Sequence, residues 1–139
     1  MIRDLADAIV TALNAEDFTK DFTAVRTLLP EYELKDMKTL HVTVIPREME
    51  IKKINRAQNR KEMTIDIAVQ VRPGDVTNAV LEPYLDLADE IVEFLDRKDF
   101  TSPAAIWLQT EHNPLCAYEH LRELRQITSV IHARYLAIE

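Results

Sequence analysis

Two segments of the chain alternate between apolar and polar residues, which is the pattern of a strand with one covered face. They are residues 40–46 (LHVTVIP) and residues 63–71 (MTIDIAVQV). Because only one face of each is apolar, the pattern predicts an antiparallel sheet that is packed on one side. A polar, charge-rich stretch, 47–62, separates them. The apolar faces comprise Leu40, Val42, Val44, Ile65, Ile67, Val69 and Val71.

Two other segments repeat apolar residues every three or four positions, the spacing of amphipathic helices. These are residues 2–15 and residues 76–97, the second with Pro83 in its early turns, where proline is tolerated. The acidic residues opposite its apolar stripe suit a solvated face, or a surface that binds cations or repels DNA phosphates. They are Glu82, Asp86, Asp89, Glu93 and Asp96.

Three further segments are rich in β-branched and aromatic residues and are predicted to be strands: 22–29, 104–111 and 125–138. A single helical turn is predicted at 34–37. The order of elements predicts an α+β fold, an antiparallel sheet with helices packed on one face. The length of 139 residues fits a single domain, residues 1–139.

Composition narrows the classes of function. A formal net charge of -7 argues against a dedicated nucleic-acid or acidic-membrane binder. Cys116 is the only cysteine, which excludes an intrachain disulfide and fits a reducing compartment. We expect no signal peptide and no membrane span, since no apolar run approaches roughly 20 residues. Gly74 is the only glycine, so a Rossmann fingerprint or a phosphate-binding P-loop is excluded.

Residues 47–62 are either a solvated charged loop or an extension of both flanking strands into a long hairpin arm. Its tip is then predicted near Ala57, Gln58 and Asn59. Strands of twelve residues reach about 40 Å, whereas the radius of gyration expected for this length is about 14 Å. We therefore expect the arm to project, or to bend at Pro46, and to need a partner because isolated hairpins are marginal.

The arm is the most basic part of an acidic chain. We expect its cations to contact another subunit or an acidic surface, because charge complementarity suits self-association into a ring. These residues are Arg47, Lys52, Lys53, Arg56, Arg60 and Lys61, with Glu48, Glu50 and Glu62 interspersed.

Candidate chemistry is sparse. His112, Cys116 and His120 are spaced like metal ligands on a helix, but Pro114 breaks that helix, so we expect no metal and no cofactor. Nucleophilic catalysis needs a serine or cysteine with a base; Ser102 lies in a connector and Ser129 on the apolar face of a strand. Glu111 and His112 are neighbours in a strand and point to opposite faces. Trp107 fits a core or interface anchor.

The order of these motifs resembles the tail terminator or tail completion (neck) proteins of long-tailed bacteriophages and prophages. The likeness covers nearly the whole chain and is carried by four stretches after the N-terminal helix. They are FTAVRTLLPEYELKDMKTLHVTVIPRE, KKINRAQNRKEMTIDIAVQV, VLEPYLDLADEIVEFL and AAIWLQTEHNPLCAYEHLRELRQITSVIHARYLAI.

The resemblance implies a structural protein of the virion, assembled in the bacterial cytoplasm, that catalyses no reaction. Its copies would form a hexameric ring that caps the tail tube. The ring would join the tail-tube protein to the head–tail connector, and DNA would only pass through its channel. An acidic ring would keep DNA from adhering to the channel wall. A head–tail adaptor or head-completion protein is an alternative. A small hydrolase or ligand-binding protein with a site near Glu111, His112 and His120 is an alternative of another class.

Overall fold

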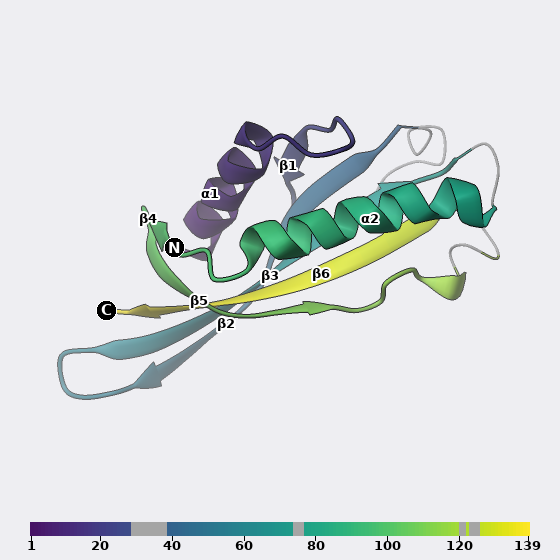
Figure 1. The fold of residues 1–139 in the computed structure, drawn as a ribbon. Helices are drawn as coiled ribbons and strands as arrows, with labels where there is room; N and C mark the ends of the chain where they lie inside the picture. The colour runs from purple at the N-terminus through teal and green to yellow at the C-terminus, as the bar shows by residue number, and fades with distance from the viewer. Residues whose placement is uncertain (29–38, 74–76, 120–121, 123–125) are drawn as a thin grey trace.

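The fold combines two helices with a curled sheet (Figure 1). The structure is a computed structural model that describes residues 1–28, 39–73, 77–119, 122 and 126–139. Its elements are α1 (Ile2–Ala15), β1 (Ala24–Arg26), β2 (His41–Lys53), β3 (Asn59–Val71), α2 (Asn78–Leu95), β4 (Phe100–Thr101), β5 (Ala104–His112) and β6 (Ile127–Ile138).

The sheet has six strands in the order β1-β2-β3-β6-β5-β4. Every neighbouring pair is antiparallel except β1 and β2, which are parallel. The predicted α+β class is confirmed, and so is antiparallel pairing of the long strands. The expectation of a wholly antiparallel sheet is wrong at β1, which runs alongside residues 42–44 of β2 in the same direction.

Both helices cover the same face of the sheet (Figure 1). The helix α1 packs on β1 and β2, and α2 packs on β5 and β6. The core lies between these layers, and the alternating residues of β3 and β6 fill it because they share the covered face. Neither helix, among the residues described, is long and apolar enough to cross a membrane. Core members include Leu5, Ile9, Ile65, Ile67, Leu87, Ile91, Ile131 and Tyr135.

The first strand is shorter than the predicted 22–29, and contacts near its start hold Phe22 and Ala24 in place. Phe22 packs on Phe18 with ring centroids 5.4 Å apart, which draws it toward the core. The Asn14 side-chain amide bonds both the N–H and the C=O of Ala24, at 2.7 and 3.1 Å. The predicted helical turn at 34–37 lies outside the described residues.

The predicted long hairpin is present as β2 and β3, which pair along their whole lengths. The predicted tip near Ala57, Gln58 and Asn59 is right for Ala57 and Gln58, which lie in the turn between β2 and β3. Asn55 organises the turn, since its Oδ1 accepts from the backbone N–H of Ala57 and Gln58 at 2.8 and 2.9 Å. Asn59 is already the first residue of β3. A bulge at Arg47 follows Pro46, at the position of the predicted bend.

The arm, residues 47–62, is not an isolated hairpin. Its β3 side pairs with β6 as far as Arg60 and Ile138, and the main chains of Asn59 and Glu139 exchange hydrogen bonds of 2.5 and 3.0 Å. The expectation of an isolated arm is therefore wrong, because a third strand supports one side of it, while its contact with a partner stays a prediction. The end of the arm extends beyond both helices (Figure 1).

Candidate functional site

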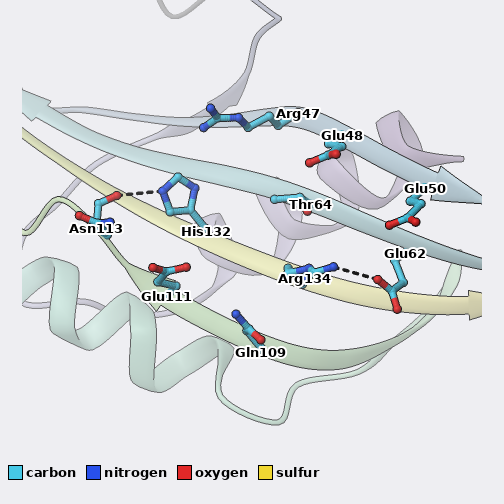
Figure 2. A pocket seen from close by; sticks show the side chains of 10 residues that line it. All are labelled: Arg47, Glu48, Glu50, Glu62, Thr64, Gln109, Glu111, Asn113, His132 and Arg134. Atoms are coloured by element: carbon cyan, nitrogen blue, oxygen red, sulfur yellow. Dashed lines mark hydrogen bonds and ion pairs between the residues drawn. The ribbon is translucent and has the colours of Figure 1, made fainter.

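The face of the sheet opposite the helices, called here the open face, carries a polar hollow of about 420 Å³. Four neighbouring strands supply its lining, so residues far apart in sequence converge there (Figure 2). Most of the lining side chains are charged. They are Arg47, Glu48, Glu50, Glu62, Thr64, Gln109, Glu111, Asn113, His132 and Arg134.

Asp66 joins two residues of the lining, Arg47 and His132. Its carboxylate is 7% exposed and binds Arg47 Nη1 at 2.5 Å and His132 Nδ1 at 2.5 Å. The bond with Asp66 raises the pKa of the Arg47 guanidinium. His132 Nε2 lies 2.8 Å from the Asn113 carbonyl oxygen. Both ring nitrogens of His132 thus lie within hydrogen-bond distance of an oxygen atom.

A second group of charges surrounds Glu62, nearer the arm. Its Oε1 accepts from Arg60 Nε at 3.0 Å, and its Oε2 accepts from Arg134 Nη2 at 2.8 Å. The bond from Arg60 is the main reason that the pKa of Glu62 falls below its ordinary value. Several charges of the hollow, those of Arg47, Glu62 and Arg134, are therefore paired within the chain, and the hollow suits contact with a polar surface better than proton transfer.

A serine, a histidine and an aspartate line up on the helix-covered side, an arrangement that sequence reasoning missed. His112 Nε2 lies 2.5 Å from Ser129 Oγ, and His112 Nδ1 lies 4.0 Å from Asp89 of α2. The order resembles a hydrolytic triad. Ser129 is fully buried, however, so a substrate has no access to its hydroxyl. The bond instead joins β5 to β6 beneath α2.

Other candidate residues are dispersed. Glu111 and His112 point to opposite faces, as predicted, since Glu111 lines the open-face hollow. Burial lowers the pKa of His112 and raises the pKa of the Cys116 thiol. His120 lies outside the described residues, and within those described no three metal-ligating side chains gather. The sequence alone does not predict the contact between His112 and Ser129, because that contact depends on the register of β5 on β6.

The six cations predicted to form an interface fall into two groups. Arg47, Arg60 and Lys61 bind carboxylates of their own chain, Lys61 pairing with Glu139 at 2.8 Å. The others are exposed on the arm: Lys52, Lys53 and Arg56. Of these, Lys52 pairs with Glu50 at 3.2 Å while remaining 64% exposed. The second group is the one available to a partner.

The outer strands of the sheet leave long backbone edges open. Along β2, β1 pairs only with Val42–Val44, and along β5, β4 pairs only with Ala104 and Ala105. Within the described parts of the chain, no other strand pairs with the outer edges of β2 and β5. Open edges are templates for pairing with another chain. Some of the exposed apolar side chains lie at the arm end of the sheet, namely Met49, Ile51, Ile54, Ile106 and Ile138, whereas Val25, Leu28, Leu115 and Tyr118 lie elsewhere.

Comparison with models of known protein families and with curated proteins finds no match to this chain. The candidate interaction surfaces of this chain are the exposed end of the arm, the outer edges of β2 and β5, and the charged hollow of the open face.

Proposed function

We propose that this chain is a structural subunit of a phage or prophage tail, a tail terminator whose copies form a ring. The ring caps the tail tube and offers its other side to the head–tail connector. The observation that carries this proposal is the pair of open strand edges on opposite sides of one sheet. A subunit with two different open edges can join head to tail with its copies, and such contacts form a ring when the rotation between neighbouring copies closes.

The arm supports the proposal by its composition. Methionine is enriched at interfaces and cations steer association, and the arm carries exposed Met49 and Ile51 beside Lys52 and Lys53. The arm also extends past the helices, where it can reach beyond its own body (Figure 1). This reach suits a subunit that contacts a neighbour and a tube at once.

The proposed role involves no catalysis. The buried position of Ser129 supports this, as does the internal pairing of the acids and bases in the open-face hollow. An acidic chain also suits a channel through which DNA passes, because a negative wall repels phosphates.

Tail-tube growth provides the test. Purified tail-tube subunits of the phage or prophage that encodes this chain are polymerised with increasing amounts of it, and tube length is measured. We expect tubes to shorten as the chain is added. The double variant Lys53→Glu, Arg56→Glu should shorten them less, because it removes exposed cations from the arm. Tubes of unchanged length at excess chain would rule out a terminator, and binding to the connector without binding to tubes would favour a head–tail adaptor.

A further inference from the structure

A groove of about 460 Å³ runs between α2 and the outer side of β5. Its walls are Val92, Trp107 and Leu108, which are apolar, with Glu93 and Asp96 exposed along the α2 side. Trp107 is fixed in the wall because its indole N–H donates to Thr110 Oγ1 at 2.8 Å. The groove thus combines an apolar wall, an acidic rim and an open strand edge.

The outer edge of the arm has the complementary character. Met49 lies opposite Met63, whose side chain is buried under the helix layer, so Met49 faces the covered side of the sheet. Ile51 and Lys53 share that face because side chains alternate along a strand. Met49 and Ile51 are 40% and 52% exposed, and the end of the arm to which they belong extends beyond both helices (Figure 1). The edge presents two apolar side chains followed by a cation.

The arm edge and the groove lie at the same level along the strands, on opposite edges of the sheet. Met49 pairs with Met63, Met63 with Tyr135, and Tyr135 with Trp107. Three successive antiparallel pairings also mean that β2 and β5 run in opposite directions. If the sheet continues from one copy to the next without a shift, β2 is antiparallel to the neighbour's β5 and Met49 lies beside its Trp107.

We propose that the arm of one copy docks in the groove between α2 and β5 of a second copy, which continues the sheet across the subunit boundary. Met49 contacts the apolar wall beside Trp107. Lys53, farther along the arm, lies toward the start of β5, where Asp96 follows α2 and Asp99 accepts from the Trp107 N–H at 2.8 Å. The partner is a second copy because this chain supplies both the basic strand and the acidic groove.

The backbone limits how long the shared ladder is. Asp99 already occupies the Trp107 N–H, β4 already pairs with Ala104 and Ala105, and Pro46 has no N–H to donate. Bulges at Arg47 and Leu108 further interrupt the two edges. Side-chain contacts and charge complementarity therefore carry much of the association, which makes charge reversal a sharp test. The inference deepens the proposed ring, and it rests on that proposed function.

Two reversed variants of the full chain test the pairing. One carries Lys52→Glu and Lys53→Glu and has an acidic arm; the other carries Glu93→Lys and Asp96→Lys and has a basic groove rim. Sedimentation at high protein concentration and low salt measures self-association. We expect the wild type to associate, and each variant alone to associate at least about tenfold more weakly because like charges then meet.

A mixture of the two variants is the decisive sample. The acidic arm of the first variant fits the basic groove of the second. The second variant keeps the wild-type basic arm, which fits the wild-type acidic groove of the first. We expect the equal mixture to recover association to within about threefold of the wild type. The matched control is Glu82→Lys with Asp86→Lys, on α2 outside the groove lining, which should leave association unchanged. Thermal unfolding of each variant verifies that it is folded.

Three results would overturn the inference: a wild type that remains monomeric, folded reversed variants that associate normally, or a mixture of folded variants that fails to recover. The tube-length assay separates this failure from failure of the proposed function. A monomeric wild type that still shortens tubes contradicts arm-to-groove docking in free copies and leaves the terminator role standing. A chain that associates through arm and groove without affecting tubes supports the docking and contradicts the role.

Discussion

Asp66 and His132 lie opposite each other in the register of β3 and β6, and their side chains meet at 2.5 Å on the open face. The carboxylate is almost buried, whereas the His132 side chain is 23% exposed. The pair fixes the middle of the face that no helix covers. Its partners Arg47 and Asn113 extend the connection to β2 and to the segment after β5.

Replacing Asp66 with Asn should destabilise the protein by about 1.5–3 kcal/mol, since hydrogen bonds to charged groups contribute in that range. Both Arg47 and His132 then lose their anionic partner. Arg47→Gln is the matched control and should cost less than about 1 kcal/mol, because the guanidinium is 59% exposed and screened by water. Urea unfolding measures both; equal losses would contradict a central role for Asp66.

His112 predicts a pH dependence of stability. Burial lowers its folded-state pKa below the ordinary 6.5, so the unfolded chain binds the proton more readily. Stability is therefore full above about pH 6.5 and falls as the pH drops toward the folded-state pKa. In His112→Gln the unfolding midpoint should therefore change less between pH 5 and pH 7 than it does in the wild type, as urea unfolding at several pH values would measure.

Ser129→Ala is the control for that experiment. It removes the contact with His112 but retains the titrating ring, so the slope of stability with pH should remain. An unchanged slope in His112→Gln would show that other groups produce the pH dependence.

Replacing Arg97, in the turn after α2, with glycine should stabilise the protein. Arg97 adopts a φ of 57°, in the left-handed region where a side chain costs about 1–2 kcal/mol. Helices commonly end on glycine in this conformation, but this chain has only one glycine, Gly74. Arg97→Gly should raise the free energy of unfolding by about 1 kcal/mol. Arg97→Ala keeps the steric cost and should not stabilise; a gain from alanine would point to the lost charge.

The Tyr135 hydroxyl is buried without a hydrogen-bond partner in the described part of the structure. Burial also raises the pKa of this phenol. Tyr135→Phe should be neutral or stabilising, since it removes an unpaired polar group and retains the ring that packs on Phe100 at 5.7 Å. Tyr135→Ala should instead cost about 3–5 kcal/mol through the cavity it leaves. A large loss in Tyr135→Phe would reveal a bound water at the hydroxyl.

Periodicity was sufficient to predict the long elements. The alternation of Ile65, Ile67 and Val69 and the stripe of α2 predicted strand and helix correctly, because burial on one face constrains every second or every third and fourth residue. The opposite orientation of Glu111 and His112 followed from the same geometry. These features depend on neighbours along the chain, so a sequence records them directly.

Contacts between distant strands were beyond that reasoning. The parallel placement of β1, the two-residue β4 and the support of Asn59 by Glu139 depend on sheet order and register. The Asp66–His132 pair joins residues far apart in sequence, and no local pattern marks it. The arm's cations were identified from the sequence, but their partners were not, because four of the six bind carboxylates of their own chain.

The central claim is that copies of this chain form a ring on the end of a tail tube. Electron micrographs of the full chain mixed with preformed tail tubes test it most directly, with tubes alone as the control. We predict a ring of density at one end of each tube, with a central channel in end views. Tubes with bare ends at saturating chain, in a sample where the chain is folded, would contradict the claim.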